Sequence, residues 1–161
     1  MLTADRLREL LDYDPATGVF TWRTTRRGKA LAGAAAGCLR RGYRVISVED
    51  RDYFAHRLAW LYVYGAWPTL GIDHISGVKD DNRLVNLREA SQLQNCANRG
   101  VHSNNAARVK GVRRLSSGRW QVRIMRDYRP FHLGSFDTLE AAKAAYAKAA
   151  EFHFGSFART A

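Results

Sequence analysis

Residues 72–95 read IDHISGVKDDNRLVNLREASQLQN, and their pattern predicts a strand, a loop, a second strand and a helix. The apolar start of this stretch indicates a strand, and the polar run 76–84 indicates a loop. A short extended piece follows at 87–90. Ser91 and Gln94 match the S-x-x-Q capping pattern, so we expect a helix to begin at Ser91. These elements form one continuous supersecondary unit.

An aspartate and a histidine stand side by side at the end of the first predicted strand, at positions 73 and 74. Phosphodiester hydrolysis needs a base for the attacking water, a cation against the leaving oxygen, and donors for the phosphoryl oxygens. His74 suits the first role because its ordinary pKa lies near neutrality. Asp73 offers a hard anionic oxygen suited to Mg²⁺ or Mn²⁺. Neighbours on a strand point to opposite faces, so either the strand ends or bends here, or only one of the two acts directly.

The residues around this pair resemble the core of an HNH endonuclease with the ββα-metal fold, the kind found in phage homing and nicking enzymes. The resemblance covers residues 55–99 and rests on A-H-R-L-A-W at 55–60, I-D-H at 72–74, Gly77, D-N-R at 81–83, N-L-R at 86–88 and Asn95. It implies that His74 is the general base, that Asp73 and Asn95 hold the metal, and that Asn86 completes the catalytic group by tying the loop down. The alternative is a polar turn with a helix-capping asparagine.

The third residue of the motif is Asn95, where other members of the family have histidine. An amide oxygen is a poorer ligand than imidazole for softer metals, which favours Mg²⁺ or Mn²⁺ over zinc. Two protein ligands leave room for the waters that Mg²⁺ usually keeps. We therefore expect one divalent ion, with Mg²⁺ preferred.

The chain is strongly basic, with a formal net charge of +11 in 161 residues. Residues 101–161 hold 11 Lys or Arg against 4 Asp or Glu, so this shorter part carries most of the excess. Such an imbalance predicts a polyanionic partner, of which nucleic acid is the commonest, although a merely soluble basic surface is the alternative. Between Arg108 and Arg129 the cations alternate with apolar residues, which predicts a sheet with one basic face.

Residues 110–157 resemble the APETALA-type (ethylene-response-factor) DNA-binding domain, through K-G-V-R-R at 110–114, G-R-W at 118–120, L-G-S-F-D-T at 133–138 and the alanine pairs at 141–142 and 149–150. That family lays three antiparallel strands, backed by one helix, into the major groove. The DNA-binding residues expected here are Lys110, Arg113, Arg114, Arg119, Arg123 and His132, with Arg83 and Arg99 near the catalytic pair. Leu115, Ser117 and Met125 depart from the plant pattern and Arg123 replaces an acid, so base preferences do not transfer.

The expected fold class is α+β: a ββα-metal HNH core with an N-terminal β-rich extension, linked to a three-stranded antiparallel sheet packed on one helix. The domains expected are a nuclease domain at 1–99 (core 55–99), a linker at 100–109 and a DNA-binding domain at 110–161. In the extension we expect a helix capped by Thr3, a turn at 14–18, strands at 19–23, 43–48 and 52–55, and a helix at 56–64.

Several other residues are weaker candidates. His56 begins an apolar helix and is interpreted as structural, while Arg88 could neutralise phosphate charge like Arg83 and Arg99. Contacts with the DNA backbone are also expected from four arginines of the N-terminal extension, Arg26, Arg27, Arg40 and Arg41. On the alanine-rich helix expected to open at 137–140, one apolar face is expected to include Leu139, Ala142, Ala145, Tyr146, Ala149 and Phe152. The two cysteines, Cys38 and Cys96, are far apart and indicate neither zinc nor a disulfide.

The predicted function is that of a metal-dependent DNA endonuclease, of a phage-type homing or nicking kind. The alternative is a sequence-specific DNA-binding regulator with an inactive HNH scaffold, and an RNA-binding role lacks a stacking motif. Double-stranded DNA is the expected partner, the protein is expected to be a monomer or weak dimer, and no membrane association is expected. Its expected place is the cytoplasm of a bacterial host, encoded by a phage or prophage.

Overall fold

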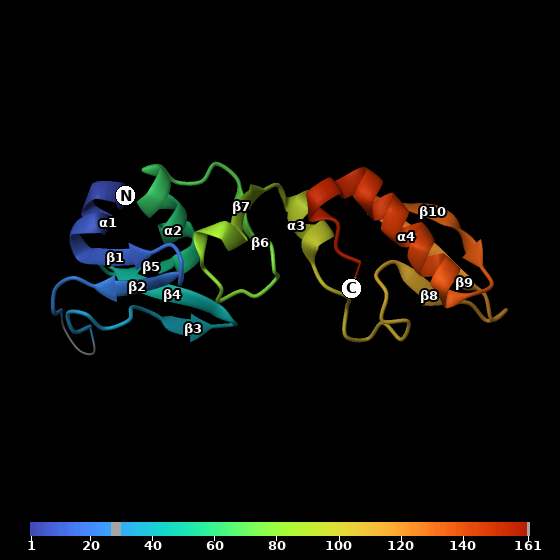
Figure 1. Ribbon diagram of the computed structural model, residues 1–161, viewed down its shortest axis with the longest axis horizontal. Helices are drawn as coiled ribbons and strands as arrows, with labels where there is room; N and C mark the ends of the chain where they lie inside the picture. The colour runs from blue at the N-terminus through green and yellow to red at the C-terminus, as the bar shows by residue number, and fades with distance from the viewer. Residues whose placement is uncertain (27–29, 161) are drawn as a thin grey trace. The chain divides into compact units, whose positions relative to one another are not determined.

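The structure is a computed structural model that describes residues 1–26 and 30–160. The chain divides into two compact units, Met1–Ala90 and Ser91–Ala161, each with its own hydrophobic core. Figure 1 follows the elements along the chain. Helices and small antiparallel sheets occur in both units, which is compatible with the predicted α+β class. Arg27, expected to contact DNA, lies outside the described residues.

The first unit opens with a short helix and a hairpin: α1 (Ala4–Leu10), β1 (Leu11–Asp14) and β2 (Val19–Trp22). Thr3 caps α1 as predicted, because its hydroxyl accepts a hydrogen bond from the backbone N–H of Arg6 at 3.2 Å. The predicted turn is closed by Gly18, whose N–H donates to the carbonyl of Asp14 at 2.8 Å. The strand β1 was not predicted, because its first residue, Leu11, fits the apolar stripe of the preceding helix.

A second sheet and a helix complete the core of this unit: β3 (Cys38–Arg40), β4 (Tyr43–Val48), β5 (Arg51–Phe54) and α2 (Ala55–Tyr64). The strands pair antiparallel in that order, and α2 packs against α1, β4 and β5. The helix α2 ends at Tyr64 as predicted, and Gly65 follows it with a positive φ of 75°, the left-handed conformation common at helix ends. Ile46, Val48, Leu58 and Leu61 are buried in the core between these elements.

Asp73, His74, Asn86 and Arg88 lie on β6 (Gly71–His74), η1 (Leu84–Asn86) and β7 (Leu87–Ala90). The strands β6 and β7 pair antiparallel, with Asp73 opposite Arg88 and His74 opposite Leu87. The first strand therefore ends at His74, which is one of the two arrangements that the sequence left open. Asp73 and His74 are both buried.

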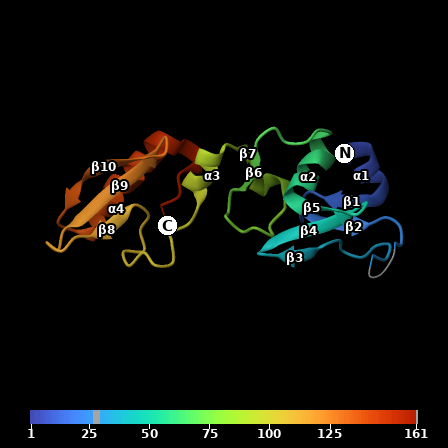
Figure 2. The same ribbon diagram turned by 180° about the vertical axis from the view of Figure 1, so that it is seen from behind.

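The second unit consists of α3 (Gln92–Asn98), β8 (Val112–Arg114), β9 (Trp120–Arg126), β10 (Arg129–Phe136), α4 (Leu139–Phe154) and η2 (Gly155–Phe157). The capping box at Ser91 and Gln94 is present as predicted. The sheet runs β10-β9-β8, all antiparallel. Figures 1 and 2 show from opposite sides that α4 lies along one face of this sheet. Val122 and Ile124 of β9 are buried in the core that α4 helps to form.

Two expectations about the second unit differ from the structure. Phe152 was expected in the core but is 83% exposed, because two residues beyond Ala150 the helix has turned the side chain away from the stripe of Ala142, Tyr146 and Ala150. The compact units divide at Ala90, before the predicted linker at 100–109. The reason is that α3 contacts α4 and η2. No helix among the described residues has the length and apolar character needed to cross a membrane.

Candidate active site

The predicted base, His74, is held at the buried end of β6. Its side chain is largely shielded, and its Nε2 lies 3.3 Å from the side-chain oxygen Oδ1 of Asn82. Burial lowers the pKa of His74, while the hydrogen bond with Asn82 opposes that shift. The imidazole is therefore neutral at neutral pH, which is the form that can accept a proton.

Asn86 fastens both ends of the loop that follows β6. Its Oδ1 accepts a hydrogen bond from the N–H of Ser76 at 2.8 Å, and its Nδ2 donates to the carbonyl of Asp81 at 2.7 Å. The carbonyl of Asn86 also accepts from the N–H of Ile75 at 2.9 Å. These contacts close the loop into a fixed shape directly after His74, which is what the predicted loop-tying role requires.

Asp73, the predicted metal ligand, forms a buried ion pair with Arg88. The Nε and Nη2 atoms of Arg88 both lie 2.9 Å from Oδ2 of Asp73 across the β6–β7 pair. Arg88 was expected to neutralise phosphate charge, and the structure instead places its guanidinium on this carboxylate. Because the side chains of Asp73 and Arg88 are only 8% and 16% exposed, removing the cation would take the ion-pair partner from a buried carboxylate.

The donor set suits a hard divalent ion. In the predicted site Asp73 would contribute carboxylate oxygen and Asn95 amide oxygen, the ligand types that Mg²⁺ prefers. Asn95 lies on α3, in the second unit, so its joint ligation with Asp73 stays a prediction. Among the described residues no three or more His, Cys, Asp or Glu side chains gather as a metal cluster. That finding does not bear on a site built from one carboxylate and one amide.

Aromatic side chains surround the His74 imidazole in the first unit. The ring of His56 meets it edge-on, with centroids 5.0 Å apart, and the Tyr43 ring lies 6.1 Å away. Phe54 stacks on His56 at 5.4 Å. Burial, together with the nearby His74 and Arg57, lowers the pKa of His56 to about 3. This neutral, packed histidine has the surroundings of the structural residue that was predicted.

Ion pairs anchor the acidic loop after β6. Arg44 of β4 binds both carboxylate oxygens of Asp80, with Nε and Nη2 at 3.0 and 2.7 Å. Arg83, expected to contact DNA, places its Nε and Nη2 on the two oxygens of Asp81 at 2.7 and 2.6 Å. The charge of Arg83 is therefore balanced within the loop, and the ion pair with Asp81 must open before Arg83 can contact DNA. The other arginine expected near the pair, Arg99, lies at the end of α3 and is exposed.

The sheet of the second unit sorts the predicted DNA-binding residues by face. Arg113, Arg123 and His132 lie on the face opposite the buried Val122 and Ile124, since Arg113 pairs with Gln121 and His132 with Arg123. Within this group Arg113 donates from Nε to Oε1 of Gln121 at 2.7 Å. These three residues have the placement that a basic groove-binding face requires.

Arg114 and Arg119 are placed differently. Arg114 follows Arg113 on β8 and so points to the other face, where its guanidinium lies 5.7 Å from the centroid of the Trp120 ring. Arg119 donates from Nη2 to the carbonyl of Ser135 at 2.6 Å and pairs with Asp137 at 2.8 Å. Both arginines are engaged within the unit, and Arg114 lies on the face opposite Arg123.

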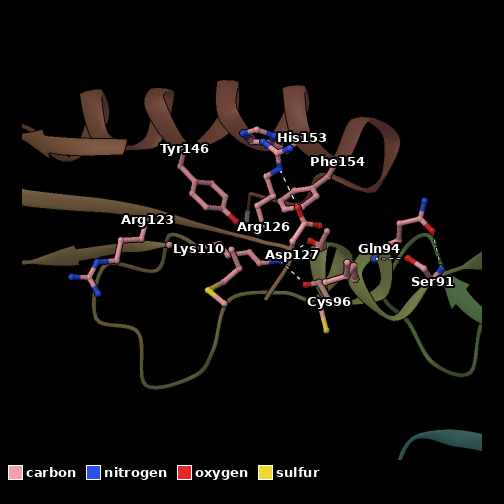
Figure 3. A pocket seen from close by; sticks show the side chains of 14 residues that line it. Ser91, Gln94, Cys96, Lys110, Arg123, Arg126, Asp127, Tyr146, His153 and Phe154 are labelled. Atoms are coloured by element: carbon pink, nitrogen blue, oxygen red, sulfur yellow. Dashed lines mark hydrogen bonds and ion pairs between the residues drawn. The ribbon is translucent and has the colours of Figure 1, made fainter. Parts of the chain in front are cut away.

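Lys110 also departs from its expected place at a DNA interface. Figure 3 shows it in the wall of a cavity of about 500 Å³ within the second unit, reaching toward the end of α3. Its Nζ donates to the carbonyls of Cys96, Ala97 and Arg99 at 3.0, 2.6 and 3.0 Å. Burial lowers the pKa of Lys110. The ammonium thus satisfies the last carbonyls of a helix, and we leave Lys110 out of the DNA-binding face.

Sequence reasoning missed the contacts that hold the loop from outside the motif. Asn82 stands in the quoted D-N-R run, but nothing in the sequence showed that it is 2% exposed and beside His74. Tyr13 is separated from it by most of the unit, yet its hydroxyl donates to the carbonyl of Asn82 at 2.7 Å. The one signal in the sequence that could have pointed to Asn82 is its position as a polar residue within the motif.

Comparison with known proteins agrees with this site. Residues 53–97 match a family model described as HNH endonuclease, which supports an HNH endonuclease domain that includes α2, β6, the loop, β7 and most of α3. A curated relative, "Uncharacterized HNH endonuclease L560" of Acanthamoeba polyphaga mimivirus, is 32% identical over 105 residues, which are 64% of this chain and 54% of the relative. The chain thus spans about half the length of the curated relative that it matches. No solved structure matches. The relative comes from a giant virus, and the APETALA-type resemblance stays a prediction.

Proposed function

We propose that this protein is a metal-dependent endonuclease that hydrolyses phosphodiester bonds in DNA, with His74 as the general base. The observation that supports it most is a neutral, buried imidazole that directly follows a buried carboxylate in the chain, within the segment that matches the HNH endonuclease family. The finer assignment to a phage-type homing or nicking enzyme is part of the proposal and rests on the sequence resemblance.

In the proposed reaction, the His74 imidazole takes a proton from the attacking water while the loop tied by Asn86 keeps the ring in one position. A general base of this kind contributes about 10²- to 10⁴-fold to the rate. Arg88 holds the Asp73 carboxylate in place through the ion pair across the two strands. The protein thus presents a fixed base and a fixed anion on consecutive residues at a strand end.

Asp73 and Asn95 are the residues proposed to hold the divalent ion, Mg²⁺ preferred. When bound, such an ion polarises the phosphoryl oxygen and stabilises the charge on the leaving oxygen. The open face of the second sheet is proposed to bind duplex DNA through Arg113, Arg123 and His132, whose side chains would contact phosphates or base edges.

The activity is tested by incubating supercoiled plasmid with the full chain and following conversion to the relaxed and linear forms. Strand breakage in Mg²⁺ or Mn²⁺ that stops on chelation is expected. Relaxed circles before linear DNA would indicate nicking by one active centre per chain. Intact plasmid across several target DNAs and both ions would contradict the proposal.

The basic open face of the sheet also fits the second candidate, a DNA-binding regulator with an inactive scaffold. That candidate predicts salt-dependent DNA binding without strand breakage. In both candidates, DNA binding is expected to be unchanged by His74→Ala. Strand breakage by the unaltered chain, and not binding, therefore separates the two.

A further inference from the structure

The side chain of Asn82 has one orientation that satisfies its surroundings. Its Nδ2 donates to the carbonyl of Asp80 at 3.1 Å, and its Oδ1 lies 3.3 Å from Nε2 of His74. An amide oxygen only accepts hydrogen bonds, so the hydrogen in this contact belongs to the imidazole. A neutral imidazole carries one ring hydrogen, so a hydrogen on Nε2 leaves the lone pair on Nδ1.

The backbone that carries Asn82 is held by the hairpin of β1 and β2. The hydroxyl of Tyr13 donates to the carbonyl of Asn82, and burial raises the pKa of that phenol, so it remains a donor. The N–H of Leu84 donates to the carbonyl of Pro15 at 3.1 Å. Gly18 approaches so closely that a Cβ built on it would lie 2.5 Å from the backbone N of Arg83. The hairpin therefore contacts the loop at Asn82 and at the two residues that follow it.

A second anchor comes from the sheet of the first unit. The Asn82 amide donates to the backbone carbonyl of Asp80. The side-chain carboxylate of Asp80 is in turn bound by Nε and Nη2 of Arg44. Asp80 is thus fixed from β4, while Asn82 is fixed from β1. The N-terminal part of the chain, for which the sequence suggested extra strands and arginine contacts with the DNA backbone, therefore holds the loop at two points.

We propose that Asn82 is a positioning residue that selects the Nε2–H tautomer of His74, so that Nδ1 is the atom that accepts the proton, and that the β1–β2 hairpin keeps Asn82 in place. The role of Nδ1 as proton acceptor rests on the proposed nuclease function, whereas the tautomer of His74 does not. The N-terminal segment is then part of the catalytic apparatus, because it sets the geometry of the base.

The tautomer is measured by nitrogen NMR of the histidine side chains in the full chain at a pH where His74 is neutral. The chain has five histidines, and the spectrum of His74→Gln identifies the signals of position 74. The unaltered protein is expected to show His74 with its hydrogen on Nε2. Asn82→Leu, which removes the acceptor, is expected to shift His74 toward a mixture of tautomers, and Asn82→Asp, which keeps an acceptor oxygen, is expected to retain Nε2–H. A hydrogen on Nδ1 in the unaltered protein, or no change in Asn82→Leu, would overturn the inference.

The kinetic consequence is measured on the same variants once their folding is checked by circular dichroism. Asn82→Leu is expected to lower kcat by about 10- to 100-fold with KM nearly unchanged, the effect typical of residues that orient a site group. Asn82→Asp is expected to recover part of the loss. Equal activity in all three proteins would refute the positioning role and leave the nuclease proposal standing. A chain that cuts no DNA would refute the nuclease proposal, while the NMR result would still decide the tautomer.

The hairpin is tested by a matched pair of tyrosines. Tyr13→Phe removes only the hydroxyl that binds the Asn82 carbonyl, whereas Tyr62→Phe alters a ring that packs in the same cluster, 5.7 Å from Tyr13. Tyr13→Phe is expected to lower kcat several-fold and to broaden the tautomer population of His74, with Tyr62→Phe close to the unaltered protein. Identical effects of the two changes would show that the hydroxyl has no specific role.

Discussion

The buried histidine beside the candidate base should make the first unit sensitive to acid. His56 is 8% exposed, and its Nδ1 has no hydrogen-bond partner in the described part of the chain. Burial is the main cause that lowers its pKa to about 3. Between that value and the ordinary pKa of about 6.5, the unfolded chain binds a proton that the folded chain does not. The free energy of unfolding therefore falls as the pH falls through this range.

The size of the effect follows from linkage. One proton bound only by the unfolded state changes the free energy of unfolding by about 1.4 kcal/mol per pH unit. From pH 7.5 to pH 4.5 the contribution of His56 is therefore a loss of about 2 to 3 kcal/mol, since little is lost above the unfolded pKa. His56→Phe keeps an aromatic ring between Phe54 and His74 and removes the proton-binding group. Between pH 7.5 and pH 4.5, His56→Phe should therefore lose about 2 to 3 kcal/mol less of its free energy of unfolding than the unaltered chain.

The assay is urea unfolding followed by tryptophan fluorescence at the two pH values. Trp22, Trp60 and Trp67 report on the first unit. The control is His102→Phe, which changes an exposed histidine and should keep the acid sensitivity of the unaltered chain. Carboxylates and His74 contribute alike in all three proteins, so the difference isolates His56. Equal losses of stability in His56→Phe and in the unaltered chain would refute the reasoning.

Three further predictions concern the loop, the ion pair and the sheet. Gly18→Ala should destabilise the first unit by more than about 2 kcal/mol, because a backbone clash is added to the cost of a positive φ of 77°. Gly33→Ala, which has open space around the new Cβ, should cost only about 1 kcal/mol. Similar shifts of the melting temperature in the two variants would contradict the clash at Gly18. Arg88→Ala should cost about 3 to 5 kcal/mol in urea unfolding by removing the ion-pair partner of a buried carboxylate, and a loss below about 1 kcal/mol would show that the pair is not buried in solution. Arg123→Ala should weaken DNA binding and reduce the slope of log K against log salt by about one, while Lys148→Ala, on the exposed side of α4, should change neither; equal effects would exclude the sheet face as the binding surface.

The local signals in the sequence were sufficient for most elements of the fold. Thr3 and Ser91 marked two helix starts correctly because a capping side chain acts within three residues of itself. Gly65 marked a helix end for the same reason, since only local backbone conformation is involved. The order of β6, loop, β7 and α3 was predicted from one continuous stretch. Short strands such as β3 were missed because three residues carry no measurable period.

The candidate site was predictable in its motif residues but not in its supports. His74, Asp73 and Asn86 could be named because their chemistry and spacing lie within one segment. The contacts of Tyr13 with Asn82 join residues far apart in the chain, and sequence spacing says nothing about such pairs. The case of Lys110 is similar, because a lysine in a basic run predicts a solvent-facing cation. In this chain the ammonium is used to cap α3.

The most direct test of the account compares the unaltered chain with His74→Ala in two assays on the same DNA. We expect the variant to bind duplex DNA with the same affinity and salt dependence, but to cut plasmid in Mg²⁺ about 10²- to 10⁴-fold more slowly, the contribution of a general base. Equal cutting rates for the two proteins would contradict the assignment of His74 as the catalytic base.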